Sequence, residues 1–397
     1  PQIEDACCLE DGDGGIQPYV LAKPIFLLTK LAFPTPRPDS LPRPHVTKQI
    51  EQGMYQKLTC ISAPAGFGKT TVLSTWARQS SYAVAWLSLD KSDNDPQRFW
   101  SYVIASLETL HEDIGEYALA LLHRPQPPAF EVILTTLLNA LTSIPDQFVL
   151  VLDDYHMITH PAIHDALTFF LNHLPPRMHL IIATRERPTL PLASLRARGQ
   201  LCELDTTGLS FTLDETVVFL QKTMQVCISP EDIVALHTHT EGWVAGLQLA
   251  ALALRKLDKT ALCLSISCGD HHYIVDYLVH EIFAQQPANL QKFLLYTSLC
   301  ERFTASLCKA LIGNDDVRAM LSHLERVNLF LIPLDEERIW YRYHKLFQNA
   351  MRKHLRQTSP DLIPLLYKRI ALWCEQNDLM REAVDYALAS SDFEYAA

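Results

Sequence analysis

The fold of this chain can be predicted from one segment, Leu58-Thr-Cys-Ile-Ser-Ala-Pro-Ala-Gly-Phe-Gly-Lys-Thr-Thr71. Its first five residues form a short, mostly apolar run that predicts a buried β-strand. Residues 63–70 then match the pattern of a phosphate-binding loop, with alanine in place of the first glycine. The loop leads into apolar residues spaced for one face of a helix, at Val72, Leu73, Trp76 and Ala77. This order of strand, glycine-containing loop and helix predicts an α/β protein with a phosphate site.

The composition of the loop follows from the chemistry of phosphate binding. Gly66 and Gly68 allow backbone N–H groups to turn toward phosphate oxygens without a Cβ in the way. Lys69 is expected to reach the β- and γ-phosphates, and the Thr70 hydroxyl is expected to bind Mg²⁺. The following helix directs the positive end of its dipole at the same anion. The sequence therefore predicts an ATP or ADP site with Mg²⁺, lined by Ala63, Pro64, Ala65, Gly66, Phe67, Gly68, Lys69, Thr70 and Thr71.

An acidic motif, Val149-Leu-Val-Leu-Asp-Asp154, complements the loop. Four apolar residues followed by two carboxylates are typical of a buried strand that ends at the ligand-binding edge of a parallel sheet. Asp153 is predicted to hold Mg²⁺ with Thr70, directly or through water. Asp154 is predicted to orient or deprotonate the attacking water. Alone, such a run is more often a plain strand end, but the phosphate loop upstream favours the catalytic interpretation.

Further apolar runs extend this layout into a sheet. Continuous runs of this length, separated by helices, indicate parallel strands that are buried on both faces. The helical spacing is clearest at residues 97–110 and 129–141. We therefore predict an α/β P-loop NTPase fold with a five-stranded parallel sheet, its strands at residues 58–62, 83–89, 148–152, 180–184 and 201–204.

Beyond residue 210 the pattern becomes helical. Thr212 and Glu215 have the spacing of a capping box at the start of a helix. Two β-rich runs around a charged turn, within Leu329–Tyr343, predict a hairpin behind helices, which is the layout of a winged helix. Helical patterns cover residues 212–223, 231–257, 272–285 and 289–297, and return from residue 360 onward.

Composition restricts the class of function. The formal net charge of −11 argues against nucleic-acid binding by this stretch, because phosphate backbones are bound by clustered lysine and arginine. The ten cysteines include no CxxC pair, so we predict reduced, mostly buried thiols. No apolar run approaches the roughly 18 residues that span a bilayer, which predicts a cytoplasmic chain without membrane contact. The acidic residues 1–22 are predicted to be disordered, and the prolines within residues 34–44 predict an extended lead-in.

Several segments together resemble a known family. They are Ser62-Ala-Pro-Ala-Gly-Phe-Gly-Lys-Thr-Thr71 with Trp76-Ala77, Trp86-Leu-Ser-Leu-Asp90 with Asp93-Asn94, Leu152-Asp-Asp-Tyr-His156, Glu241-Gly-Trp-Val-Ala-Gly-Leu-Gln-Leu-Ala250, Leu329-Phe-Leu331 and Trp340-Tyr-Arg-Tyr-His-Lys-Leu-Phe347. In these segments the chain resembles the nucleotide-binding half of the ATP-dependent LuxR-type transcriptional activators of the MalT type, members of the STAND class of signalling ATPases. The resemblance begins at about Leu41 and continues to the C-terminus.

The resemblance implies a division into domains. An extended or disordered segment at residues 1–40 is followed by a P-loop nucleotide-binding domain at 41–210 and a helical domain at 211–285. A winged-helix domain at 286–358 and the start of a TPR-like repeat sensor domain at 359–397 complete the chain. In the family, ADP is buried at the junction of the first three domains in the resting form.

The resemblance also implies roles for single residues. His344 resembles the winged-helix histidine that touches the ADP β-phosphate, although a packed core histidine is the alternative. Arg185 resembles a sensor arginine for the γ-phosphate, next to Thr184, or else it is an exposed residue at a strand end. Gly246–Ala250 resembles the segment near the adenine, with Gln248 where the family often has proline. Arg43 is expected to help close the nucleotide pocket, and Trp243 and Trp340 are expected in the core.

The function that follows from the resemblance is a slow ATPase switch, ADP-bound at rest and ATP-bound and self-associated when active. In the family an inducer, a small molecule or a protein, binds a repeat domain, and DNA is bound by a separate C-terminal domain. Both would lie outside this chain. The alternatives are a STAND ATPase with another output domain, such as a kinase or cyclase, a continuously hydrolysing P-loop ATPase, and a scaffold that binds nucleotide without cleaving it.

Overall fold

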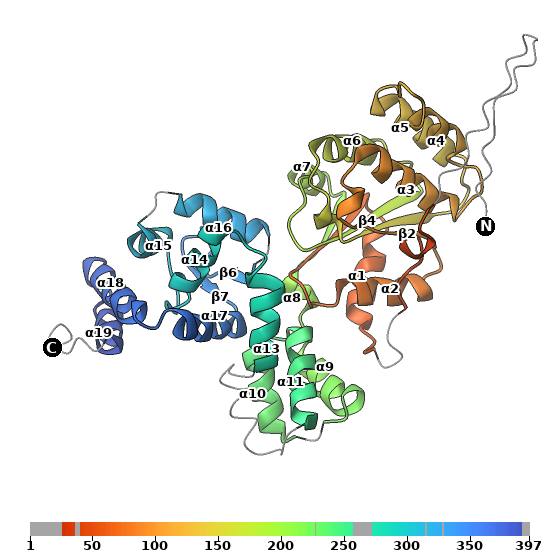
Figure 1. Ribbon diagram of the computed structural model, residues 1–397. Coiled ribbons are helices and arrows are strands. Elements are labelled where there is room, and N and C mark those ends of the chain that lie inside the picture. Colours follow the sequence, from red (N-terminus) through yellow and green to blue (C-terminus); the bar gives the residue numbers. More distant parts are fainter. Residues whose placement is uncertain are drawn as a thin grey trace, which may run out of the picture.

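The computed structural model describes residues 26–35, 40–226, 228–256, 272–313, 316–327 and 329–390. The predictions for the acidic tail of residues 1–22 and for residues 391–397 lie outside these ranges. The elements form three groups that follow one another along a bent molecule: an α/β group, a helical group and a C-terminal group (Figure 1). Among the described residues, no helix combines the length and the apolarity that crossing a bilayer requires.

The α/β group is built on the predicted five-stranded parallel sheet, which is confirmed. The strand order is β2-β3-β4-β1-β5, so the two strands that carry the phosphate-site motifs, β1 and β3, flank β4. Ser62 pairs with Thr184, and Ser88 pairs with Asp153, so the carboxyl ends of these strands meet at one edge. The strands are β1 (Leu58–Ser62), β2 (Ala83–Ser88), β3 (Phe148–Asp153), β4 (Met178–Thr184) and β5 (Leu201–Leu204).

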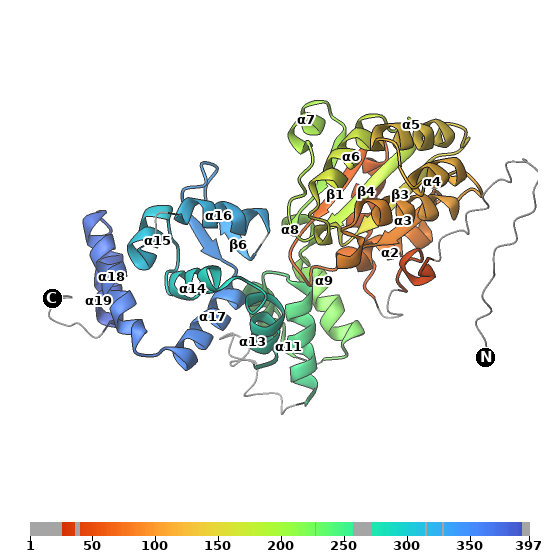
Figure 2. The same cartoon turned by 45° about the horizontal axis from the view of Figure 1, so that its top comes forward.

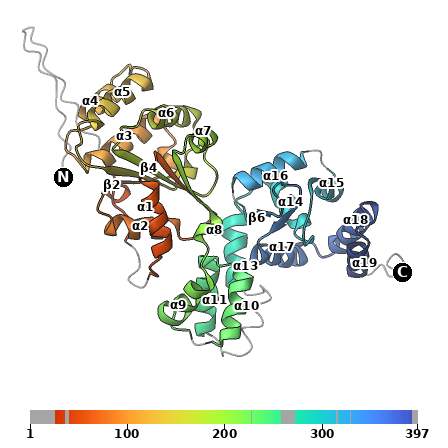
Figure 3. The same cartoon turned by 180° about the vertical axis from the view of Figure 1, so that it is seen from behind.

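Helices cover both faces of this sheet, which explains its continuous apolar strands (Figure 3). Alternate residues of a strand point to opposite faces. Ile61, Val149 and Val151 accordingly join a core with α1 (Pro44–Gly53) and α2 (Lys69–Gln79), while Leu58 and Leu150 join a second core. The second core contains α3 (Pro96–Glu108), α4 (Glu116–Leu122), α5 (Phe130–Leu141), α6 (Pro161–Asn172) and α7 (Leu192–Ala197). Short 3₁₀ turns lie at η1 (Leu28–Lys30), η2 (Lys91–Asp93) and η3 (Tyr155–Met157).

The helical group follows β5. The capping box is confirmed, because the Glu215 N–H donates to Thr212 Oγ1 at 3.2 Å and the Thr212 N–H donates to Glu215 Oε2 at 2.9 Å. The helical group contains α8 (Thr206–Leu209), α9 (Leu213–Val218), the π turn η4 (Phe219–Thr223), α10 (Pro230–Thr240), α11 (Val244–Lys256), α13 (His272–Tyr277) and the π turn η5 (Leu278–Phe283).

The helical pattern predicted over residues 231–257 is found, but it is interrupted once. The structure divides it into α10 and α11 at Glu241 and Gly242, whose φ angles are 50° and 72°. Such left-handed values end a helix. A Cβ on Gly242 would lie 2.4 Å from the Phe211 carbonyl oxygen, so close approach of the backbone requires glycine here. The break places Trp243 at the start of a new helix.

The C-terminal group contains the predicted hairpin, which is confirmed. β6 (Leu331–Pro333) and β7 (Tyr341–Tyr343) pair antiparallel, with Leu331 opposite Tyr343. The Asp335 carboxylate accepts from the Ile339 and Trp340 N–H groups at 2.7 and 2.9 Å and fixes the turn. Around the hairpin pack α14 (Ala288–Thr297), α15 (Ala305–Ile312), α16 (Val317–Arg326) and α17 (Lys345–Thr358). The last two helices, α18 (Leu362–Gln376) and α19 (Met380–Ala389), lie side by side beyond them (Figure 2).

Candidate nucleotide-binding site

The loop between β1 and α2 has the backbone that phosphate binding requires. Gly66 and Gly68 have φ angles of 81° and 77°, values that residues with a side chain rarely adopt. Phe67 between them is buried, so the loop is anchored to the core by a side chain that turns inward. α2 begins directly after Gly68, which directs its free N–H groups at the concave side of the loop.

Lys69 lies within the loop rather than in solvent. Its Nζ donates to the carbonyl oxygens of Ala63 at 2.6 Å and Pro64 at 2.9 Å, and the residue is 7% exposed. Burial, reinforced by the charge of Arg185, lowers the pKa of Lys69 to about 8, while Asp154 and Asp153 oppose this shift. The amine is therefore still mainly protonated at neutral pH. A phosphate group in the loop would add negative charge directly beside this ammonium.

Thr70 and Asp153, the two residues predicted to hold Mg²⁺, are hydrogen-bonded to each other. Thr70 Oγ1 donates to Asp153 Oδ2 at 2.8 Å, and the Asp154 N–H donates to Asp153 Oδ1 at 3.0 Å. Burial and the neighbouring Asp154 raise the pKa of Asp153 to about 6, and this residue is 2% exposed. A buried carboxylate with a raised pKa gains from a cation beside it. A hydroxyl and one carboxylate suit Mg²⁺, which commonly takes one or two protein ligands and completes its shell with water and phosphate oxygens.

Asp154 differs from its neighbour in exposure and backbone. Its side chain is 41% exposed, and its φ of 57° turns the chain sharply after β3. His156 Nδ1 lies 3.8 Å from its carboxylate, but burial lowers the pKa of His156 to about 3, so this imidazole is neutral and forms no ion pair at neutral pH. The Asp154 carboxylate is therefore open to water, as the predicted water-orienting role requires.

Thr184 and Arg185, at the end of β4, differ in their surroundings. Thr184 is fully buried, and its hydroxyl donates to the Glu186 carbonyl oxygen at 2.8 Å, so it is engaged in a local turn. Arg185 is exposed, and its charge reaches Lys69 and His156, whose pKa values it lowers. The structure thus brings Arg185 to the phosphate loop and leaves Thr184 in the sheet.

A cavity of about 340 Å³ opens beside the loop, within the size range of small-molecule pockets. Gln248 of α11 lies in its wall, as does Arg43. Arg43 is held by an ion pair with Glu215 at 2.9 Å and by the carbonyl oxygens of Leu209 and Ser210 at 2.7 and 2.9 Å. The apolar part of the wall suits a flat base and includes Phe67, Phe211, Phe219, Met224 and Val244.

His344 approaches the loop from the opposite side. It lines a larger cavity of about 930 Å³ together with Pro64 and Phe67. Its Nε2 lies 2.8 Å from the Thr240 carbonyl oxygen, which can only accept, so Nε2 carries the proton. Nδ1 is buried without a hydrogen-bond partner among the described residues, and burial lowers the pKa of the ring.

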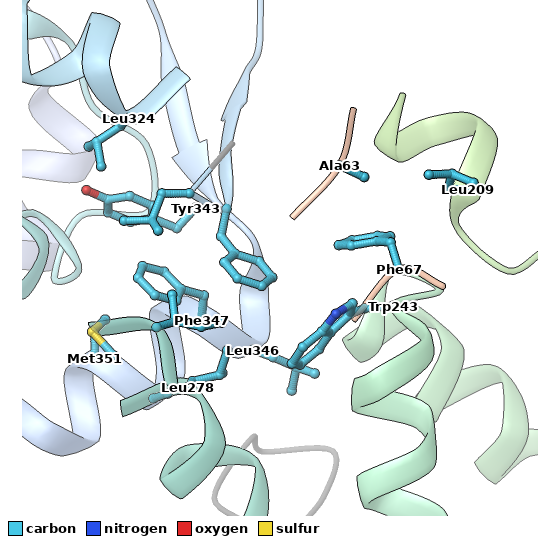
Figure 4. Packing of buried hydrophobic residues seen from close by; sticks show 14 of the residues in the cluster. Ala63, Phe67, Leu209, Trp243, Leu278, Leu324, Tyr343, Leu346, Phe347 and Met351 are labelled. Carbon is cyan, nitrogen blue, oxygen red and sulfur yellow. The ribbon is translucent and has the colours of Figure 1, made fainter. Parts of the chain in front are cut away.

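Two contacts to the loop escaped the sequence analysis. Trp243 Nε1 donates to the Ala65 carbonyl oxygen at 3.0 Å, and the Ala245 N–H donates to the Gly66 carbonyl oxygen at 3.0 Å. Figure 4 shows the Trp243 indole between the loop that carries Phe67 and residue Leu346 of the C-terminal group. Trp243 is fully buried, as the sequence predicts for a core residue, but it is also a hydrogen-bond donor to the loop.

Comparison with known proteins supports the fold described above. Residues 279–363 match the family described as the MalT winged helix domain, a range that contains α14 to α17 and the β6–β7 hairpin. A Walker-type ATPase of Pyrococcus abyssi has a similar fold, with a TM-score of 0.55 at 14% identity over 82% of this chain and all of that chain.

Curated relatives match nearly the whole chain. The serine/threonine-protein kinase PknK of Mycobacterium tuberculosis is 32% identical over 383 residues, which are 96% of this chain and 34% of that protein. The HTH-type transcriptional regulator MalT is 30% identical over 370 residues in Vibrio parahaemolyticus and 32% identical over 366 residues in Serratia proteamaculans. These matches cover 93% and 92% of this chain but 41% and 40% of the two regulators.

The chain therefore spans between a third and two fifths of the length of these relatives. The match to PknK covers 383 residues and therefore includes the phosphate loop, the parallel sheet and the winged helix. The chain thus carries a winged helix domain of the MalT type and is similar over most of its length to MalT regulators and to PknK.

Proposed function

We propose that this chain is a nucleotide-dependent switch that binds ADP or ATP with Mg²⁺ and hydrolyses ATP slowly. The observation that carries the proposal is the Thr70–Asp153 hydrogen bond of 2.8 Å, which joins the phosphate loop to the acidic strand end. Both oxygen atoms lie beside Lys69, whose burial makes an anionic ligand favourable. A phosphate chain with its cation satisfies all three groups at once.

Each residue has a distinct task in the proposed reaction. The Lys69 ammonium exchanges its two carbonyl partners for phosphate oxygens, and Thr70 and Asp153 hold Mg²⁺, which supplies charge neutralisation. Asp154 orients the water that attacks the terminal phosphate. Arg185 adds positive charge on the same side. The base lies in the cavity of about 340 Å³, against the apolar wall that Phe211 contributes.

A switch is favoured over a continuously working enzyme because three groups of elements share the site. The loop belongs to the α/β group, its Trp243 contact comes from the helical group, and His344 comes from the C-terminal group. Nucleotide exchange in such a junction requires the groups to move apart. A change of nucleotide would therefore shift an equilibrium between two arrangements.

The output of the switch depends on segments outside this chain. The MalT relatives support a transcriptional activator, in which inducer binding, self-association in the ATP form and DNA binding would accompany the nucleotide cycle. The PknK relative equally supports the alternative of a kinase output on the same core. Sequencing the natural gene on both sides of this stretch would distinguish the two: a helix-turn-helix favours the activator, and a kinase domain favours the alternative.

The first experiment is to denature the purified chain before any ligand is added and to identify the released nucleotide by anion-exchange chromatography. Near-stoichiometric ADP would support the resting form of a switch. A protein without nucleotide that hydrolyses ATP at about 1–100 s⁻¹ would contradict the proposal and favour a continuous ATPase. Absence of binding to any nucleotide would refute the site itself.

A further inference from the structure

Four successive carbonyl groups of the phosphate loop are each held by a donor. Ala63 and Pro64 accept from Lys69, as described above. The next carbonyl, Ala65, accepts from the Trp243 indole, and the one after it, Gly66, accepts from the Ala245 N–H. The first two donors belong to the loop's own lysine, whereas the other two come from the start of α11, nearly 180 residues away in sequence. Two of the four carbonyl groups are therefore oriented by residues outside the loop.

The orientation of these carbonyls decides what the loop offers to a ligand. In a planar trans peptide, a C=O and the following N–H point in opposite directions. Fixing the Ala65 and Gly66 carbonyls toward α11 turns the N–H groups of Gly66 and Phe67 away from it, onto the side where such loops bind phosphate oxygens. The contact is also tight, since a Cβ on Gly66 would lie 2.5 Å from Ala245 Cβ and 2.8 Å from Trp243 Nε1.

Residues 240–245 include the two loop contacts, Trp243 and Ala245, and the other end of this segment is held by the C-terminal group. Arg342 donates to both Glu241 carboxylate oxygens, at 2.8 and 3.0 Å. The Lys345 N–H donates to Glu241 Oε1 at 3.2 Å, and His344 Nε2 donates to the Thr240 carbonyl oxygen at 2.8 Å. Residues 240–245 thus join the β7–α17 corner to the phosphate loop through an unbroken series of contacts.

We propose that Trp243 is a positioning residue for the phosphate loop, and that residues 240–245 transmit the position of the winged helix domain to it through the Glu241–Arg342 pair. This inference rests on the proposed nucleotide binding. Movement of the winged helix domain would release Glu241, let Trp243 leave the Ala65 carbonyl and free the peptide planes of the loop. The affinity for the phosphate part of the nucleotide would then fall, while the contacts to the base would remain.

The first test compares two ligands that differ only in phosphate. Trp243→Phe keeps an aromatic ring and removes the N–H donor. Calorimetric titration should give about tenfold weaker binding of ADP, the loss of roughly one hydrogen bond, and unchanged binding of adenosine. The matched control is Trp100→Phe, because Trp100 is also fully buried but its indole N–H has no hydrogen-bond partner among the described residues. Both ligands should bind this control as they bind the wild type.

The outcomes separate the inference from the function on which it rests. An equal loss for ADP and adenosine would make Trp243 a core residue only, and no loss for either would remove its role in the loop. A wild-type chain that binds neither ligand would refute the nucleotide site, whatever the variants do. Circular dichroism should show the same helix content for all of these proteins.

The second test addresses transmission and does not depend on the first variant being stable. Glu241→Gln keeps the shape of the side chain and removes the charge that Arg342 contacts. Stopped-flow measurement should show severalfold faster release of a fluorescent ADP analogue. Combined with Trp243→Phe, the effects should be less than additive, because both act on the same segment. Additive effects, or an unchanged release rate in Glu241→Gln alone, would refute transmission through residues 240–245.

Discussion

Replacing Asp153 by asparagine should stabilise the nucleotide-free protein while abolishing its Mg²⁺ site. Burial and Asp154 raise the pKa of Asp153 from its ordinary 3.8 to about 6. A pKa raised this far corresponds to roughly 3 kcal/mol of unfavourable charge burial at neutral pH. Asparagine can accept the Asp154 N–H as the carboxylate does, and a weaker contact to Thr70 costs about 1 kcal/mol. The net gain should be about 2 kcal/mol.

The pH dependence gives this prediction a sign. Because the folded pKa of Asp153 lies above its unfolded value, its protonation adds stability that is complete below pH 3.8 and is lost as the pH rises through about 6. Wild-type stability should therefore approach that of Asp153→Asn as the pH falls from 7.5 to 5. The lowered pKa values of buried His156 and His179 act in the opposite direction, but both proteins share them.

The assay is thermal unfolding of protein stripped of nucleotide, with and without MgADP. A gain of about 2 kcal/mol corresponds to an unfolding midpoint roughly 4–8 °C higher for a domain of about 150–250 residues. MgADP should raise the midpoint of the wild type but hardly that of the variant. Asp146→Asn, an exposed residue just before the same strand, is the control and should change nothing. An equal or lower midpoint for Asp153→Asn at pH 7.5 would refute the reasoning from burial.

Three further predictions concern the remaining residues of the site. Lys69→Met should abolish MgATP binding in calorimetry with helix content retained, and undiminished affinity would show that the phosphates bind elsewhere. Asp154→Ala should keep ATP bound but slow phosphate release by a factor on the order of 10² or more, so normal turnover would transfer the water-orienting role to another group. His344→Ala should release ADP faster, and it should lose a tightening of ADP binding at lower pH, because a phosphate beside the buried ring favours the protonated form. An identical pH profile in the two proteins would return His344 to a purely structural role.

Much of the α/β group could be predicted because its signals are local. The buried strand, the glycine positions and the pair of carboxylates follow one another within short segments, and a parallel sheet brings its strand ends to one edge. The Thr70–Asp153 hydrogen bond is therefore found where the two motifs predict it. The hairpin in residues 331–343 was predictable for the same reason, since its two strands and its turn are adjacent in sequence.

Contacts between distant segments could not be predicted in this way. Periodicity marks a side chain as buried but does not name its partner, so Trp243 was assigned to the core without its donor role. Arg43 donates hydrogen bonds to Glu215 and to two carbonyl groups more than 160 residues away, and no local pattern signals these contacts. Apolar spacing does not signal the break at Glu241 and Gly242, because it continues across these residues.

The proposed chemistry of this protein is encoded locally, because the loop for phosphate, the oxygen ligands for a divalent cation and the carboxylate for water each lie in a short run of neighbouring residues. Only the tertiary structure reveals which distant residues lie beside that loop and would control it. Glu241 and Trp243 lie between α10 and α11, whereas Arg342 and His344 lie at the β7–α17 corner. The two segments meet beside the loop because the helical and C-terminal groups continue the core that covers one face of the sheet. Contacts between distant segments depend on how whole helices and strands pack, and a short segment of sequence carries no information about that packing.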